Sequence, residues 1–265
     1  MPPTPKKSTK IIHLILLIIF LIVFAIATYF ALKSLLNNLQ KESVPNTIDI
    51  SQVISDQTET TTSETSASPE IKIIPAELNL KVPFYAQAPF ANWDLPWQET
   101  CEEASVLLVA NIYFQHNWPR EEFNNQILAL VEWEKKQFGD YKHTTVGQTA
   151  EILNNYLNLK TVIHENPTFE EVKNILSQGH LIVMTFAGKE LGNPNYKNGG
   201  PLYHAMVIKG YKAGEKVITN DVGTRNGADY VYKWKTIEQA LHDYNDPIDG
   251  GAKKFIEVLP PENKN

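Results

Sequence analysis

The feature that most constrains the fold of this chain is an almost wholly apolar run at residues 11–32, IIHLILLIIFLIVFAIATYFAL. At about 1.5 Å rise per residue, a helix of this length crosses a hydrocarbon core of roughly 30 Å. A cleaved signal peptide is the alternative. However, the run is longer than the usual hydrophobic region of a signal, and no clean small-x-small cleavage site follows it. We therefore predict a transmembrane helix that stays in the protein.

The charges beside the run indicate its orientation. Three lysines lie within residues 1–10, which favours a cytoplasmic N-terminus, although Lys33 and Lys41 on the far side weaken the bias. The expected location is the cell membrane, with a single span. Everything after the span is then extracytoplasmic.

The composition changes over residues 33–75 to Ser, Thr, Glu, Gln and Asp, with the low-complexity core TETTTSETSAS. Such a segment cannot bury enough apolar surface to offset the conformational entropy that it would lose on folding. We expect a disordered stalk over 33–75, followed by one globular domain over 76–262.

Composition also narrows the function classes. The 265 residues carry a formal net charge of -6 and no stripe of Lys and Arg interleaved with aromatic residues, so no nucleic-acid partner is expected. Cys101 is the only cysteine, which excludes an internal disulfide framework and a zinc site made of thiolates. We predict neither a metal nor a cofactor. The Asp-rich stretch 243–249 lacks the spacing of a calcium-binding loop and is expected to be a solvated turn.

Hydrophobic patterning divides the domain into two halves. After a β-rich stretch at 78–86, helices are expected at 104–115, 120–137, 144–157 and 168–179, the last opened by the capping-box pattern Thr168-Phe169-Glu170-Glu171. A short strand at 159–163 interrupts this half. Strands are then expected at 180–186, 204–211, 216–221, 228–233 and 255–259. Helices followed by antiparallel strands predict an α+β fold.

Cys101 lies where a polar loop, rich in Trp and Pro, enters the apolar helix. A thiol in the first turn of a helix lies at the positive end of the helix dipole, which stabilises a thiolate. This position indicates a nucleophile. The alternative is a small buried residue that packs the helix into the core.

A cysteine nucleophile needs a base, and the base needs an orienting group. His204 opens a strand, and a two-residue hairpin loop at Ala213-Gly214 would pair Lys212 with Glu215. Met206 would then pair with Asp221. In that register His204 and Asp221 share one face of the sheet, while Asn220 points to the other. His180 also opens a strand but has no such acidic partner downstream in register, so we expect it to be structural.

An acyl-transfer site also needs donors for the oxyanion. The backbone amide of Cys101 can supply one. A side-chain amide from the preceding loop can supply the second, and Gln87 and Gln98 are both candidates. Sequence spacing alone does not choose between them.

The four segments VPFYAQAP, ETCEEASVLLVANIYF, HAMVIKGY and ITNDVGTRNG, in this order, resemble the papain-like cysteine peptidases. More narrowly, they resemble the bacteriocin-processing (double-glycine) peptidase-like family, over about 76–260. The resemblance implies a papain-like fold with Cys101 as nucleophile, His204 as general base and acid, and Asp221 as orienting carboxylate. It assigns the oxyanion-hole role to Gln87, the glutamine of VPFYAQ, with Gln98 as fallback.

Two features depart from that family. Its members usually have Gly after the cysteine, where this chain has Glu102 followed by Glu103, and two acids there would disfavour a thiolate. The transporter-fused members act on leader peptides in the cytoplasm, whereas this chain has an anchor, a stalk and no transporter segment.

The sequence thus predicts a membrane-anchored extracytoplasmic cysteine peptidase or amidase that acts through a thioester on a peptide or peptidoglycan-like substrate. A cell-wall amidase or a transpeptidase-like acyltransferase would use the same chemistry. The alternative from another class is a catalytically inactive peptidase-like domain that binds peptide or cell wall.

Three aromatic residues flank the proposed cysteine and histidine. They are Trp93, Trp97 and Tyr203. Aromatic loop residues supply contact area at binding sites, so we predict that these three line the substrate cleft. The alternative is that they cap the core.

Overall fold

The computed structural model describes residues 6–40, 42–60 and 74–261. The chain divides into two compact units, Met1–Ser43 and Val44–Asn265. Each unit is described by itself below.

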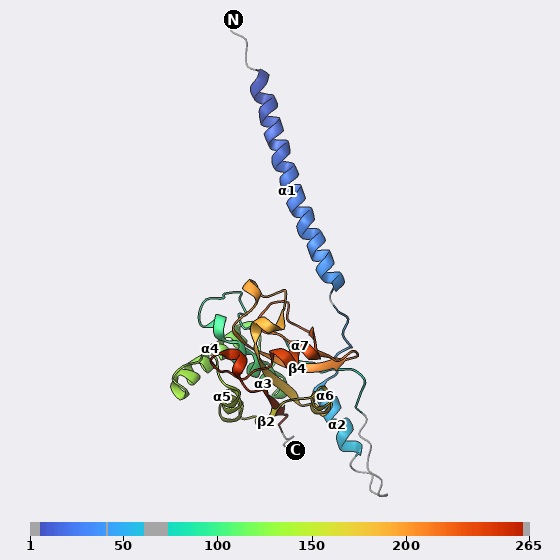
Figure 1. Ribbon diagram of the computed structural model, residues 1–265, viewed down its shortest axis with the longest axis vertical. Coiled ribbons are helices and arrows are strands. Elements are labelled where there is room, and N and C mark those ends of the chain that lie inside the picture. The colour runs from blue at the N-terminus through green and yellow to red at the C-terminus, as the bar shows by residue number, and fades with distance from the viewer. Residues whose placement is uncertain (1–5, 41, 61–73, 262–265) are drawn as a thin grey trace. The chain divides into compact units, whose positions relative to one another are not determined.

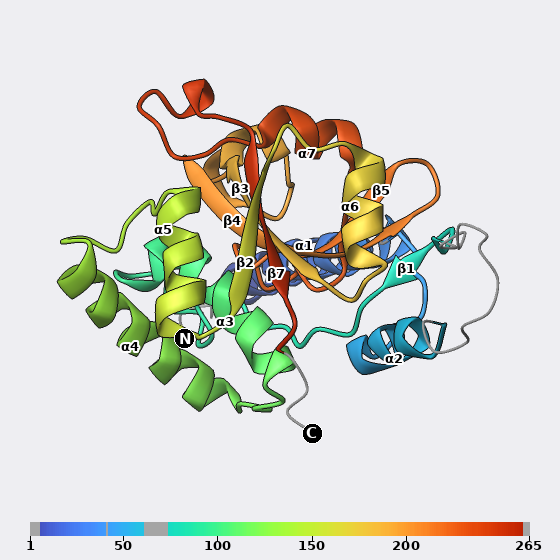
Figure 2. The same cartoon turned by 90° about the horizontal axis from the view of Figure 1, so that it is seen from below.

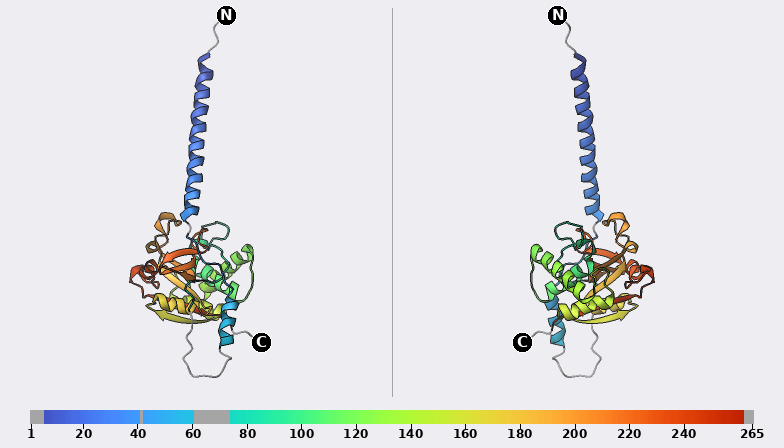
Figure 3. Two further views of the ribbon diagram at one scale, coloured as in Figure 1. Left: turned by 90° about the vertical axis from the view of Figure 1, so that its right-hand side faces the viewer. Right: turned by 90° about the vertical axis from the view of Figure 1, so that its left-hand side faces the viewer.

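The first unit consists of one helix, α1 (Lys6–Gln40), which runs without interruption (Figure 1; Figure 3). Its segment Ile11–Phe30 has a mean hydropathy of 3.1 and is long and apolar enough to cross a membrane. The helix continues to Gln40, past the predicted end at residue 32, into the region expected to be a stalk. That part of the stalk prediction is wrong.

The second unit contains a mixed array of helices around one antiparallel sheet. The described strands are β1 (Leu78–Asn79), β2 (Lys160–Glu165), β3 (Leu181–Ala187), β4 (Tyr203–Lys212), β5 (Lys216–Asn220), β6 (Tyr230–Lys233) and β7 (Lys254–Leu259). Their order is β2-β7-β3-β4-β5-β6, and β1 pairs with the far end of β4. Every described strand pair is antiparallel, which confirms the predicted helix-plus-antiparallel-sheet class.

Helices cover the sheet. The α-helices are α2 (Ile50–Thr60), α3 (Cys101–Tyr113), α4 (Arg120–Gln137), α5 (Val146–Glu151), α6 (Phe169–Leu176) and α7 (Trp234–Ala240). Short helical turns are η1 (Trp97–Glu99), η2 (Ile152–Tyr156), η3 (Gly188–Leu191), η4 (Lys197–Gly199) and η5 (Ile248–Gly250). In Figure 2, β2 and β7 lie between α5 on the left and α6 on the right.

Helix α3 is the centre of the core. Each residue from Cys101 to Asn111 is buried, because the helix packs against β3, β4 and α4. A helix that is hydrophobic on nearly all sides is stable only when it is enclosed. The segment ASVLLVA makes α3 such a helix, and the sheet and α4 enclose it.

Two capping boxes begin helices in this unit. Thr168 and Glu171 form the predicted one at the start of α6, with the Glu171 amide donating to Thr168 Oγ1 at 3.1 Å. Thr145 and Gln148 form a second one at the start of α5. The predicted helix 144–157 is therefore real but divided, because α5 passes into the wider turn η2 at Ile152.

Residues 44–60 belong to the globular unit rather than to a stalk. Ile48 forms a parallel bridge with Leu80, and Lys81 makes an ion pair with Asp49 at 3.3 Å. Ile50 at the start of α2 is buried in the core. Its spacing from Val53 and Ile54 gives the helix an apolar face, which a composition-based prediction of disorder overlooks. Residues 61–73 lie outside the described residues.

The β4–β5 hairpin differs from its predicted register at the turn but agrees near His204. Lys212 pairs with Lys216 instead of Glu215, so the loop is one residue longer than predicted. An irregularity between Ile208 and Gly210 shifts the pairing back by one residue. Val207 therefore pairs with Asn220, which is the register that the prediction required at this end.

A pair of buried acids joins α3 to α4. Glu103 and Glu134 are both fully buried and interact with each other, and none of their carboxyl oxygens has a hydrogen-bond partner among the described residues. If both were ionised, their oxygens would have no donor among the described residues, so one of them holds a proton. Burial raises the pKa of Glu134 to about 8, and burial and the charge of Glu134 also raise the pKa of Glu103.

We expect Glu134→Gln to make the stability of the protein less dependent on pH. The folded state keeps a proton that the unfolded chain releases, so wild-type stability falls as pH rises from about 4.5 towards 8. Gln cannot ionise, so the variant should gain about 4 kcal/mol on the wild type between about pH 5 and pH 9. Chemical denaturation across this range measures the effect. Glu132→Gln, an exposed site on the same helix, is the control, and parallel curves for wild type and Glu134→Gln would contradict the assignment.

Candidate active site

Cys101 is the first residue of α3 and is 6% exposed. Its Sγ donates a hydrogen bond to Oε2 of Glu102, which lies 2.9 Å away. The residue before it, Thr100, is also buried, and its hydroxyl donates to the carbonyl of Trp97 at 3.2 Å. Side-chain hydrogen bonds of Thr100 and Cys101 therefore fix the first turn of α3.

The electrostatic setting of Cys101 differs from the one that the helix dipole alone predicts. Burial raises the pKa of the Cys101 thiol well above its ordinary value, and the charges of Glu102 and Glu103 raise it further. A backbone hydrogen bond from Ala205 acts in the opposite direction. That contact brings the sulfur next to the residue that follows His204.

His204 and Asp221 are in direct contact, as predicted from the hairpin. Nε2 of the His204 ring lies 2.8 Å from Oδ1 of Asp221, and both side chains are almost completely buried. Asn220 points away, and its Nδ2 donates to the carbonyl of Pro83 at 3.1 Å. Gly223 lies against the ring, since a Cβ there would be 2.7 Å from His204 Cε1.

Asp221 is held by several donors. The hydroxyl groups of Tyr196 and Tyr232 each donate to Oδ2 at 2.6 Å, Asn193 Nδ2 donates to it at 2.9 Å, and the Gly223 amide donates to Oδ1 at 3.1 Å. Burial alone would raise the pKa of Asp221. The charge and hydrogen bond of His204, together with the two tyrosines, instead hold this pKa below its usual value. Asp221 is therefore a stable buried anion.

Sequence reasoning missed Asn193, Tyr196 and Tyr232. The first two lie in the loop before β4, and Tyr232 lies on β6, which pairs with β5. Alternation along β6 could have indicated Tyr232, which pairs with Val217 on the neighbouring strand. Nothing in the loop sequence GNPNY identifies its contacts, because they depend on how the loop folds back.

Gln87 connects the segment before Cys101 to the residue that follows Asp221. Its backbone amide donates to the Val222 carbonyl at 2.9 Å. Its side-chain Nε2 donates to the carbonyls of Trp97 and Gln98, at 2.9 and 3.0 Å. Both amide hydrogens are thus directed at the backbone before Cys101. The other candidate, Gln98, is exposed, and its Nε2 donates to Glu99.

The three predicted cleft aromatics lie in different environments. Trp93 is half-buried in the loop before η1. Trp97 is half-buried, packs against the core, and donates from Nε1 to Asn124 at 2.9 Å. Tyr203 is 2% exposed and donates to the Thr144 carbonyl, so it caps the core, the second of its two predicted roles.

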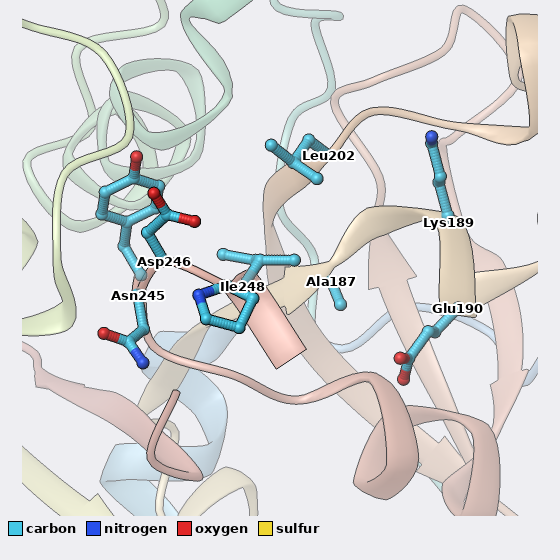
Figure 4. A pocket seen from close by; sticks show the side chains of 9 residues that line it. Ala187, Lys189, Glu190, Leu202, Asn245, Asp246 and Ile248 are labelled. Atoms are coloured by element: carbon cyan, nitrogen blue, oxygen red, sulfur yellow. The ribbon is translucent and has the colours of Figure 1, made fainter. Parts of the chain in front are cut away.

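A pocket of about 450 Å³ lies beside Tyr203. Ala187, the β3 partner of Tyr203, lines it, together with the exposed side chain of Leu202. Figure 4 shows Leu202, Ala187 and Ile248 towards its middle, with Lys189 and Glu190 on one side and Asn245 and Asp246 on the other. Tyr244 and Pro247 complete the lining. The pocket has an apolar interior and a charged rim.

Ring contacts join this pocket to the segment before the cysteine. Tyr244 stacks on His143 at 5.1 Å between ring centroids, and His143 lies 3.9 Å from the carboxylate of Glu99. Tyr203 contacts both rings edge-on. The pocket is therefore next to both the Cys101 loop and the His204 strand.

His180 has an acidic partner, contrary to the prediction. Its Nδ1 lies 2.5 Å from Glu257 on β7, and Glu257 also contacts His164 at 2.7 Å. The partner was missed because it comes from a strand far along the chain. This cluster lies before the start of β3, whereas His204 pairs with Phe186 near its other end. Among the described residues, no group of His, Cys, Asp and Glu side chains is arranged to hold a metal ion.

The comparison with protein families identifies the family of this chain. Residues 79–246 match the model of the Peptidase_C39 like family. Because the match covers more than half of the chain, the protein belongs to that family, and its helix-plus-antiparallel-sheet structure is a C39-like peptidase fold. The resemblance found in the sequence is confirmed at the family level.

The search of solved structures matched the following two chains, among others. A proposed C39-like peptidase from Bacillus anthracis is 17% identical with a TM-score of 0.47, and the match covers 71% of this chain and 99% of that one. UfSP from C. elegans is 12% identical with a TM-score of 0.32, over 74% of this chain and 36% of that one. A search of curated proteins gave no match.

We expect Asp221→Asn to destabilise the protein by about 3 kcal/mol, because an amide NH2 at the position of Oδ2 would face Tyr196, Tyr232 and Asn193, all of which donate there. Chemical denaturation at neutral pH measures the change. Asp94→Asn, at an exposed loop position, should change stability by less than about 0.5 kcal/mol. Equal effects at the two sites would show that the donors around Asp221 contribute nothing.

Proposed function

We propose that this protein is a cysteine peptidase or amidase with Cys101, His204 and Asp221 as its catalytic triad. The buried contact of 2.8 Å between His204 and Asp221, next to the sulfur of Cys101, is the observation that carries the proposal. Membership of the Peptidase_C39 like family supports a cysteine-peptidase type of function.

The roles follow from the geometry. Asp221 binds Nε2 of His204 and stabilises the imidazolium, so the ring exchanges protons at Nδ1. Cys101 attacks the substrate carbonyl, and the carbon–nitrogen bond breaks as His204 gives its proton to the leaving amine. Water then hydrolyses the thioester. The backbone amide of Cys101 is the proposed first donor to the oxyanion.

Gln87 is proposed as the second donor. In the structure its amide group binds the carbonyls of Trp97 and Gln98, so this role requires Nε2 to release one of them when substrate binds. Without such a movement, Gln87 serves to hold the loop before Cys101.

The pocket beside Leu202 is the proposed place for a substrate side chain. Its apolar interior suits an aliphatic or aromatic group, and its position next to β4 puts that group close to the reacting carbonyl. Trp93 and Trp97 are proposed to flank the other end of the substrate. A peptide or peptidoglycan-like chain fits this arrangement.

We propose that α1 anchors the protein in a membrane and that the catalytic unit faces the extracytoplasmic side. The apolar segment Ile11–Phe30 and the lysines before it support this proposal.

A second candidate is a peptidase-like domain that binds peptide or cell wall without cleaving it. The contact between Cys101 and Glu102 favours it, because a neighbouring carboxylate holds the sulfur as a thiol. The reactivity of the sulfur decides between the two.

We expect iodoacetamide to modify the full-length protein in detergent faster at about pH 6 than it modifies free cysteine, because a thiolate paired with a histidine persists there. Cys101 is the only cysteine, so the mass shift reports on it alone. His204→Ala should slow the reaction at least tenfold. His180→Ala, at the other end of β3, should not change it. A wild-type rate no faster than free cysteine, unaffected by His204→Ala, would favour the binding module.

We expect a library of fluorogenic peptides to show preference for an apolar residue next to the cleaved bond. Leu202→Ser should raise KM for those peptides several-fold, because a polar group then lines the apolar pocket. Val162→Ser, an exposed apolar site on β2, is the matched control. An unchanged preference in Leu202→Ser would remove this pocket from the substrate site.

A further inference from the structure

The carboxyl group of Glu102 touches the sulfur of Cys101. Its Oε2 lies 2.9 Å from Sγ, and the residue is 1% exposed. Its other oxygen, Oε1, is buried and has no hydrogen-bond partner among the described residues. A charged carboxylate that receives only a weak thiol donor is costly in such a place, so the geometry favours a proton on Glu102.

Several ionisable groups interact electrostatically with Glu102, and His204 is the base among them. The facing groups are Glu99 of η1, Cys101 and Glu103 of α3, Glu134 of α4, and Tyr203 and His204 of β4. Burial raises the pKa of Glu102 to about 7, whereas its contacts with Cys101 and His204 act to lower it. The carboxyl group therefore changes its charge near neutral pH.

We propose that Glu102 is a catalytic residue that controls where the proton of the Cys101 thiol resides, a proposal that rests on the function proposed above. As a carboxylate, Glu102 accepts the S–H group and keeps the sulfur a neutral thiol. As a carboxylic acid, it becomes a donor to the sulfur, and the thiol proton passes to Nδ1 of His204.

The proton balance of this step is simple. The S–H bond breaks, an N–H bond forms on His204, and the O–H bond of Glu102 stays intact while it donates to the thiolate. Asp221 holds the imidazolium that results. The reactive state contains the thiolate, the imidazolium and protonated Glu102. It carries one proton more than the resting state, which contains the thiol, neutral His204 and ionised Glu102.

This arrangement reverses the usual pH dependence of a thiol. Free cysteine becomes more reactive as pH rises, because its thiolate fraction grows. In this protein the thiolate is favoured while Glu102 is protonated and is lost as pH rises through about 7. The acid after the nucleophile would then limit activity to mildly acidic and neutral conditions.

The pH profile of iodoacetamide modification of the full-length protein tests the proposal. The wild-type rate should fall about tenfold between about pH 6 and pH 8, since one pKa unit is tenfold in population. Glu102→Gln keeps an N–H donor beside the sulfur and cannot ionise, so its rate should change less than about twofold over the same range. Glu132→Gln, at an exposed acid of α4, is the matched control and should follow the wild type.

The outcomes separate this proposal from the proposed function. If wild type and Glu102→Gln have superimposable profiles while His204→Ala slows both, the role of Glu102 is overturned and the triad stands. If the wild type is no faster than free cysteine at any pH and His204→Ala has no effect, the triad itself fails.

A measurement on the wild type covers the case in which Glu102→Gln does not fold. The chain has one cysteine, so its infrared S–H stretching band comes from Cys101 alone. The proposal expects this band to be stronger at about pH 8 than at about pH 6. The opposite order, or an unchanged band, overturns it.

Discussion

The packing of α3 against β4 is the contact on which the rest of the structure depends. The helix is buried from Cys101 to Asn111, so it can be stable only inside the unit, between the sheet and α4. Because the cysteine is the first residue of that helix and His204 is near the start of β4, enclosing the helix brings the two together. The packing of the core therefore also assembles the candidate site.

Because Asp221 and Glu102 are buried in this core, the hydrogen bonds that each carboxyl group receives determine whether it is ionised. Asp221 and Glu102 are equally buried, but Asp221 receives hydrogen bonds from His204, two tyrosines, an asparagine and a backbone amide. Glu102 receives one from a thiol and has an oxygen without a partner among the described residues. In a water-poor interior this difference lowers the pKa of Asp221 and raises that of Glu102. Two carboxyl groups near His204 thus have pKa values shifted in opposite directions.

The sequence allowed prediction of the fold class, the family, and the contact between His204 and Asp221, because each depends on local patterns along the chain. It did not allow prediction of contacts between distant segments. Tyr196 and Tyr232 reach Asp221 through a folded loop and a neighbouring strand, and Glu257 reaches His180 from β7. Composition failed for residues 44–60, because the apolar face of α2 is short and lies within a polar segment.

The alignment of His204 with Asp221 also depends on a buried lysine. The turn after β4 sets a register one residue away from the required one, and the irregularity at Lys209 restores it. Lys209 is 1% exposed and donates to Asp229 at 2.6 Å and to the side-chain oxygen of Asn79. Because Asn79 belongs to β1 and Asp229 precedes β6, these bonds fix the shifted residue from two sides. A polar network outside the site thus determines which residue faces the histidine, Asp221 rather than Asn220.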